Sequence, residues 1–174
     1  MNRRDMLKLT GAAVAGSTIF GIDAIASEKS SDATASTQGN KPKKALIIGA
    51  HPDDPETGCG GTMVMLRKAG WDVVSVYMTR GEAGIKGKTH EESSAIRVKE
   101  ATEACKIMDV RPLFMTQIDG SSEVTKERYT EMKEIIAAEK PDLVFTHWPM
   151  DSHADHRTCF RVCGTISRRP LYWL

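Results

Sequence analysis

Two short clusters of histidine and aspartate carry the side chains of this sequence that best suit metal chemistry. The first, at residues 51–54, reads His-Pro-Asp-Asp, and the second, at residues 153–156, reads His-Ala-Asp-His. Imidazole nitrogens and carboxylate oxygens are ligands of catalytic zinc, which takes three protein ligands and leaves one position open for water. Zinc-bound water has a pKa of about 7 and is available as hydroxide at neutral pH. The two clusters together therefore indicate a metal-dependent hydrolase.

We predict that one ion lies between the two clusters. His51, Asp54 and His156 supply two imidazoles and one carboxylate, which is a complete ligand set for a catalytic zinc or a related divalent transition metal. Asp53 is adjacent to a predicted ligand in the sequence but points elsewhere. Because the attacking water must lose a proton, we predict that Asp53 is the general base.

The second cluster offers two more functional groups. His153 is predicted to stabilise the oxyanion or to protonate the leaving group, and Asp155 to orient one of the histidines. Each cluster alone has a simpler interpretation: a single His-x-x-Asp is most often a turn whose Asp bonds to the backbone, and Asp155 suits a solvated, charged loop equally well. The occurrence of both clusters, each just after an apolar run, favours the metal site.

Strands and helices that alternate along the chain must position these residues. The apolar runs predict strands, and the three- and four-residue spacing of apolar side chains between them predicts helices. A capping box of Thr89 and Glu92 marks one helix start. The predicted strands are 44–49, 71–78, 112–115 and 142–146, and the helices are 57–69, 89–109, 123–139 and a short segment that ends at 164.

The most economical arrangement is an α/β fold, a single Rossmann-like domain with a doubly wound, mainly parallel sheet of strand order 3-2-1-4. In that order the first and fourth strands are neighbours where the winding reverses direction, and ligands bind at this switch point. Residues 51–56 follow the first strand and 147–156 follow the fourth. The topology therefore predicts that the two clusters meet. His147, directly after the fourth strand, is predicted to be structural.

Composition sets aside several classes of protein. A length of 174 residues with 40% hydrophobic side chains suits one domain with a sizeable core. The formal net charge of +1 and the lack of a basic stripe argue against a nucleic-acid partner. Gly58, Gly60 and Gly61 do not form the Gly-x-Gly-x-x-Gly fingerprint, which argues against a dinucleotide cofactor.

Residues 1–26 are predicted to be a twin-arginine export signal. Arg3 and Arg4 precede a weakly apolar, Gly/Ala-rich segment that ends in a small-x-small cleavage pattern, Ala-Ile-Ala. A membrane anchor needs about 20 strongly apolar residues, and this segment is shorter and contains Asp23. We expect an exported protein, periplasmic or extracellular, without a stable membrane span once the signal is removed.

The predicted signal is followed by a linker and then by the folded domain. Residues 27–43 have almost no apolar side chain, which predicts a disordered linker. The domain is expected at 44–174. Export permits disulfides, but the cysteine spacing specifies none, and we expect small apolar core residues rather than half of a zinc site at Cys159 and Cys163.

Four motifs resemble those of the PIG-L (LmbE-like) family of zinc-dependent N-acetylglucosaminyl deacetylases, namely residues 50–56, 58–62, 79–84 and 153–157. The resemblance extends from about Lys44 to Thr158. It implies a Rossmann-like fold and hydrolysis of the acetamide of a glucosamine-type sugar, which would be a small-molecule substrate. Family members continue after the last motif with further elements, so we expect a C-terminally truncated family domain.

The resemblance also implies roles for single residues. It assigns the zinc ligands to His51, Asp54 and His156, the general base to Asp53, and polarisation of the carbonyl or stabilisation of the tetrahedral intermediate to His153. These are the roles that coordination chemistry alone indicates.

Two arginines are predicted to bind the substrate, Arg80 and Arg97, and Arg97 matches a family position associated with substrate contact. Two alternatives to a deacetylase stay open. One is a carbohydrate- or metal-binding protein without turnover. The other is a metal-dependent phosphoesterase, which ranks last because the ligand set lacks the carboxylates for two metals.

Overall fold

The structure is a computed structural model that describes residues 41–164 and 171–174. The predicted export signal lies outside the described residues, and so does the predicted linker as far as residue 40. Residues 41–43 have no regular secondary structure. A compact unit begins at Lys41.

The described strands form one parallel five-stranded sheet of order β3-β2-β1-β4-β5. The predicted order 3-2-1-4 is confirmed, and one strand is added beside β4. The sequence did not reveal this strand, because a run of three residues is too short to show alternation. The strands are β1 (Lys44–Gly49), β2 (Asp72–Thr79), β3 (Arg111–Gln117), β4 (Leu143–Thr146) and β5 (Leu171–Trp173).

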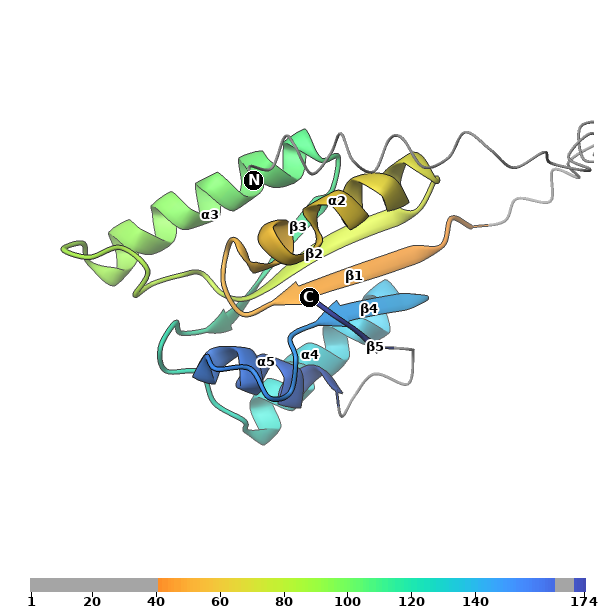
Figure 1. Ribbon diagram of the computed structural model, residues 1–174. Helices are drawn as coiled ribbons and strands as arrows, with labels where there is room; N and C mark the ends of the chain where they lie inside the picture. Colours follow the sequence, from red (N-terminus) through yellow and green to blue (C-terminus); the bar gives the residue numbers. More distant parts are fainter. Residues whose placement is uncertain (1–40, 165–170) are drawn as a thin grey trace, which may run out of the picture. The chain divides into compact units, whose positions relative to one another are not determined.

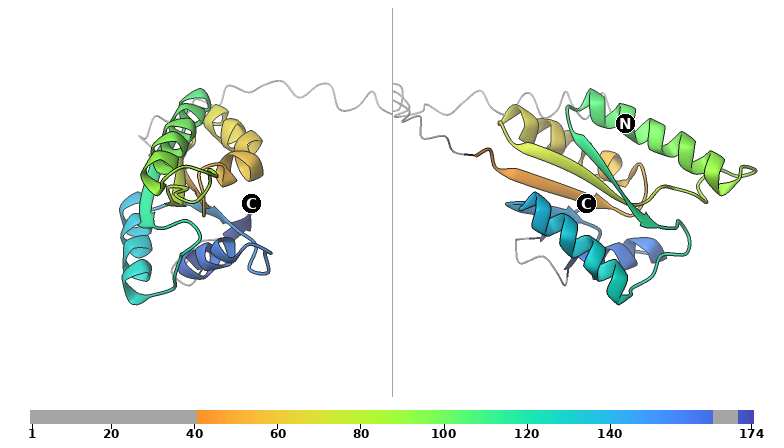
Figure 2. Two further views of the ribbon diagram at one scale, coloured as in Figure 1. Left: turned by 90° about the vertical axis from the view of Figure 1, so that its left-hand side faces the viewer. Right: turned by 180° about the vertical axis from the view of Figure 1, so that it is seen from behind.

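Helices cover both faces of the sheet. In Figure 1, α2 and α3 lie above the sheet and α4 and α5 lie below it, and the end-on view of Figure 2 shows the same two layers. This arrangement follows from right-handed crossovers between parallel strands. The helices are α2 (Asp54–Lys68), α3 (His90–Ile107), α4 (Lys126–Glu139) and α5 (Ala154–Gly164).

Alternate residues of the buried strands serve the two layers, because successive side chains of a strand point to opposite faces. Leu46 and Ile48 of β1 pack in the cluster that contains Met132 of α4 and residues of α5. Ala45 and Ile47 pack in the cluster formed with α2 and α3. The sheet is therefore buried on both faces, as its continuous apolar runs predict.

One helix begins earlier than predicted from the sequence. The helix α2 begins at Asp54 instead of residue 57, since Pro55 suits a first helical turn. The helix α5 begins at Ala154. Both predicted ligand clusters thus end inside a first helical turn. The capping box of Thr89 and Glu92 at the start of α3 is confirmed.

The cysteines are buried, and none forms a disulfide: Cys59, Cys105, Cys159 and Cys163. They are core residues, as expected for Cys159 and Cys163. No helix within residues 41–164 and 171–174 combines the length and the apolar character that a membrane crossing requires.

A network of ion pairs ties the amino ends of the strands to α4. Lys44 Nζ lies 3.0 Å from Asp72 Oδ2 and 2.6 Å from Glu139 Oε2, and Arg111 Nη2 lies 2.6 Å from the same Glu139 oxygen. Burial raises the pKa of Glu139, but Arg111 and Lys44 outweigh it and hold the pKa below its ordinary value. The ionised carboxylate therefore stabilises the fold at neutral pH.

We expect Lys44→Met to lower the free energy of unfolding by about 1.5–3 kcal/mol at neutral pH, because it removes charge-assisted hydrogen bonds from two carboxylates. The lowered pKa of Glu139 means that its contribution is present above pH 4.5 and is lost as pH falls through the folded-state pKa. The difference between variant and wild type should therefore shrink in acid, as measured by urea unfolding.

The matched control is Lys106→Met. Its ammonium is exposed and lies 3.9 Å from Glu103, so this change should stay within about 0.5 kcal/mol. A Lys44→Met deficit that is as large at about pH 3 as at pH 7 would contradict the assignment to Glu139.

Candidate metal-binding active site

The site lies where β1 and β4 end side by side. The two strands pair in parallel register from Ala45↔Leu143 to Ile47↔Phe145, so the loops that follow them leave the sheet together. The backbone N–H of Ala50 donates to His147 Nε2 at 2.9 Å. His147 thus fastens the end of β4 to the end of β1, which is the structural role expected of it.

The structure brings the three predicted metal ligands together around the Asp54 carboxylate. One carboxylate oxygen, Oδ2, lies 3.3 Å from His51 Nδ1, and the other, Oδ1, lies 3.4 Å from His156 Nε2. The ring centroids of His51 and His156 are 5.3 Å apart. Atoms that bind a tetrahedral zinc at about 2.0–2.2 Å lie roughly 3.4 Å from one another. Each histidine therefore lies at a suitable distance from the Asp54 carboxylate, although these three side chains are not one of the groups in the described residues whose donor atoms all lie within 4.8 Å of one another.

The opposite nitrogen of His51 faces two carboxylates. His51 Nε2 lies 3.1 Å from Asp155 Oδ2 and 3.2 Å from Asp119 Oδ1. Asp155 is itself fixed, since it accepts from the Gly120 N–H at 2.8 Å and from the Ser122 hydroxyl at 2.6 Å. A carboxylate that accepts the Nε2 proton leaves the Nδ1 lone pair pointing at Asp54. Asp155 thus contacts a histidine of the first cluster, His51.

Three groups of donors within the described residues are close enough to hold a metal ion: His51 with His153 and His156, Asp54 with His147 and His156, and His51 with Asp119 and Asp155. They overlap, because His51 and His156 each belong to two of them. The Nε2 lone pair of His147 is already used by the Ala50 N–H. The buried Asp155 already accepts from Gly120 and Ser122. Asp54 likewise accepts from the His51 N–H through Oδ2 at 2.7 Å, which leaves its Oδ1 facing His156 Nε2.

Electrostatic attraction between Asp54 and the neighbouring histidines stabilises this cluster. Burial raises the pKa of Asp54, but contacts with His147, His156 and His51 outweigh it and hold the pKa far below its ordinary value. Burial lowers the pKa of His51, yet the neighbouring carboxylates, Asp119 first, raise it to about 10, so a cation that binds Nδ1 must displace a proton from it. Asp54 is therefore a carboxylate at any ordinary pH, which a cation requires of its ligand.

Asp53, the predicted base, is held in an unusual backbone conformation. Its φ of 131° lies in a region that residues with a side chain rarely occupy. The carboxylate is 65% exposed and lies 2.7 Å from Arg97 Nη2. Burial raises its pKa, the charge of Arg97 opposes this, and the net result is a pKa above the ordinary value. Asp53 lines the same cavity as His51 and Asp54.

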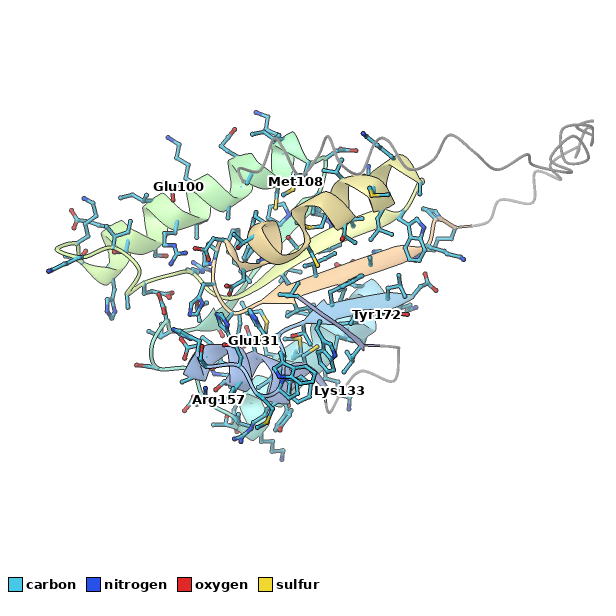
Figure 3. All side chains as sticks on the ribbon, in the orientation of Figure 1. Glu100, Met108, Glu131, Lys133, Arg157 and Tyr172 are labelled. Carbon is cyan, nitrogen blue, oxygen red and sulfur yellow. The ribbon has the colours of Figure 1, made fainter. Side chains whose placement is uncertain are left out.

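His153 lies at the rim of the site. Its ring is 4.9 Å from that of His51 and 4.7 Å from that of His156, measured between centroids. The Asp155 N–H donates to His153 Nδ1 at 3.3 Å, so a neutral imidazole carries its proton on Nε2. Arg157, labelled on α5 in Figure 3, donates to the backbone carbonyls of residues 151 and 152 and so fixes the loop before His153.

A cavity of about 350 Å³ opens beside these residues. Its lining includes Arg97 but not Arg80, whose side chain is exposed. The substrate-binding role of both arginines stays a prediction. The cavity is lined by His51, Asp53, Asp54, Ala83, Gly84, Arg97, Asp119 and His153.

Two residues of the site were missed by sequence reasoning. Asp119 faces His51, and the buried Glu82 accepts from the Asp119 N–H at 3.1 Å and from the Arg80 N–H at 3.2 Å. The third strand was predicted to end at residue 115, whereas β3 continues to Gln117. With the correct end, Asp119 follows a strand as closely as His51 does, and the same rule would have selected it.

The fold class is a Rossmann-like α/β domain, with a cluster of metal-ligand side chains at the switch point of its parallel sheet. Residues 46–166 match the PIG-L family, GlcNAc-PI de-N-acetylase. The chain belongs to this family.

Individual relatives agree with the match. The chain is 34% identical over 125 residues to the diacetylchitobiose deacetylase of Thermococcus kodakarensis, covering 68% of this chain and 46% of that protein. It is 29% identical over 163 residues to the uncharacterized deacetylase YaiS of Escherichia coli, covering 84% and 85%. Among solved structures, the N,N'-diacetylchitobiose deacetylase of Pyrococcus horikoshii, complexed with its inhibitor MPG, superposes with a TM-score of 0.65 at 33% identity, covering 69% and 47%.

The chain therefore spans most of the Escherichia coli protein but about half the length of the diacetylchitobiose deacetylases. It covers part of the family fold, as the sequence analysis expected. The relatives named here are deacetylases, which are hydrolases.

We expect His156→Ala to weaken zinc binding by more than the roughly 10–100-fold that is typical for loss of an outer hydrogen-bond partner, because it removes a donor from the set around Asp54. Zinc titration against a competing chelator measures this. His90→Ala is the control, since His90 is exposed at the start of α3. Equal zinc affinity of the two variants would contradict the proposed donor set.

Asp119→Asn separates the competing donor groups. An amide still accepts the His51 Nε2 proton, so zinc affinity should fall by no more than about 10–100-fold if Asp119 only orients His51. Loss as severe as that of His156→Ala would instead identify Asp119 as a ligand. The same zinc titration decides between the two roles.

Proposed function

We propose that this protein is a zinc-dependent deacetylase that hydrolyses the N-acetyl group of an N-acetylglucosamine-type sugar or conjugate. The observation that carries the proposal is the convergence of His51 and His156 on Asp54, beside a cavity that is lined by His51, Asp54 and the exposed carboxylate of Asp53. Membership of the PIG-L family and the deacetylase relatives support the choice of reaction.

The donor set suits zinc on chemical grounds. Two imidazole nitrogens and one carboxylate oxygen are a ligand set of catalytic zinc sites, and the Asp54 carboxylate lies 3.3 Å from His51 Nδ1 and 3.4 Å from His156 Nε2. A bound zinc would polarise the acetamide carbonyl and lower the pKa of water. Asp155 and Asp119 face the outer nitrogen of His51, so they favour the form in which Nε2 keeps its proton and Nδ1 gives up its own to a bound cation.

Asp53 transfers a proton from the attacking water to the departing nitrogen. Amide hydrolysis adds a water oxygen to the carbonyl carbon and breaks the C–N bond, so one water proton must leave and the departing nitrogen must gain one. Asp53 lines the cavity, is exposed, and is not needed as a ligand. It accepts the water proton and returns it to the nitrogen, which yields acetate and the free amine.

His153 stabilises the negative charge that develops on the carbonyl oxygen. Its Nδ1 accepts from the Asp155 N–H, which leaves Nε2–H as a donor at the rim of the cavity. This is the role that its position in the His-Ala-Asp-His motif predicts.

We also propose that the mature protein acts outside the cytoplasm. The twin-arginine pair and the small-x-small pattern at residues 24–26 support export. The route carries folded proteins, which suits an enzyme that acquires its metal before export.

We expect the zinc-loaded protein to release acetate from N-acetylglucosamine conjugates, and Asp53→Asn to lower kcat by about 10²–10⁴-fold while zinc is retained. Acetate release and bound zinc are measured on the same samples. Full turnover in a zinc-replete Asp53→Asn variant would remove Asp53 from the mechanism.

The same panel tests the alternatives. Zinc binding without acetate release would favour the carbohydrate- or metal-binding protein. Phosphate release from phosphoesters would favour the metal-dependent phosphoesterase.

A further inference from the structure

Arg97 of α3 occupies a space that two glycines leave open. A Cβ placed on Gly84 would lie 2.2 Å from Arg97 Nη1, and a Cβ on Gly81 would lie 2.6 Å from Arg97 Cδ. Both distances are far below van der Waals contact, so a side chain at either position would displace the arginine. The glycines of the loop after β2 therefore form a seat for Arg97.

From this seat the guanidinium reaches the turn that carries Asp53. Its Nη2 donates to the Pro52 carbonyl oxygen and lies 2.7 Å from Asp53 Oδ2. The Arg97 side chain is only 15% exposed, whereas that of Asp53 is 65% exposed. The arginine is thus the buried, fixed partner of the pair, and the aspartate is the partner that solvent can reach.

Arg97 contacts Asp53, the residue of the site with the least favourable backbone conformation. Asp53 has a φ of 131°, and such a conformation persists only where the surrounding structure holds it. Arg97 holds the carbonyl before Asp53 and the carboxylate of Asp53 with one group. Loss of this group would free both the main chain and the side chain of the turn.

Arg97 also stands between two cavities. It lines the cavity of the candidate site, and it lines a larger one of about 610 Å³ toward α2 and α3, together with Asp53 and Gly84 in both cases. A guanidinium committed to protein acceptors in this wall has a structural task that substrate binding does not explain.

We propose that Arg97 is a positioning residue, which acts by holding Asp53 in the geometry needed for proton transfer. The expected effect of Arg97 on catalysis rests on the proposed function. Its expected effect on the turn that carries Asp53 rests on the contacts alone. Gly84 then has the role of leaving room for the arginine.

The experiment compares Arg97→Met, Arg97→Lys and Gly84→Ala with Gly61→Ala as the matched control. Gly84 does not have a positive φ, so alanine suits its backbone and acts only through the space it fills. Gly61 lies in α2 with nothing within 4 Å of an added Cβ. Hydrogen exchange of the segment 50–57 is measured in the zinc-loaded proteins, together with kcat and KM for acetate release.

We expect faster exchange of the segment 50–57 in Arg97→Met and Gly84→Ala but not in Gly61→Ala. We also expect kcat to fall by about 10–100-fold with little change in KM, since a small misplacement of a catalytic group has effects of this size. Arg97→Lys should recover part of the rate, because an ammonium keeps the charge but lacks the planar guanidinium. In the Asp53→Ala background, Arg97→Met should lower kcat no further.

Three results would overturn the inference: unchanged exchange in Arg97→Met, a raised KM with kcat intact, or a further loss in the Asp53→Ala background. The last two would restore the substrate-binding role. If the wild-type protein releases no acetate, the proposed function fails. The exchange measurement then still decides whether Arg97 holds the turn.

Discussion

The parallel pairing of β1 with β4 is the contact on which the whole site depends. Neither strand carries a ligand, but their common carboxyl edge sets where the chain leaves the sheet on both sides of the switch point. The hydrogen bond from the Ala50 N–H to His147 joins the two exits directly. The first exit enters α2 at Asp54 and the second, after a longer loop, enters α5 at Ala154, so Asp54 and His156 both stand in first helical turns.

A second set of contacts holds the neighbouring loops. Thr79, at the end of β2, donates to the Ala50 carbonyl at 2.9 Å, and Glu82 accepts from the backbone of Asp119. The loop after β2 is thereby tied to the loops after β1 and β3. It supplies no donor to the cluster around Asp54, yet it fixes the surroundings of several residues that form it. Its glycines, Gly81 and Gly84, leave room for Arg97, and its buried carboxylate, Glu82, binds the backbone of Asp119, so both features have a structural explanation.

The sequence predicted much of this arrangement because the relevant signals are local. Apolar runs and helical spacing were enough for the strand order, and the position of each cluster just after a strand was enough to bring His51 and His156 together. The structure differs where tertiary contacts decide. Gln117 is polar but fully buried, so the apolar run ended too early and Asp119 was overlooked. The contact between Arg97 and Asp53 joins α3 to the turn after β1, and no local pattern records it.

Both layers of helices contribute residues to the site. His156 and Asp155 stand on α5, on one face of the sheet, while Arg97 reaches Asp53 from α3, on the other face. Each face has its own apolar core. Asp54, however, begins α2, which packs in the same core as α3, so the proposed donor set draws on both halves of the interior. Evolution, or a protein engineer, could therefore not repack one half without disturbing residues that the other half helps to place.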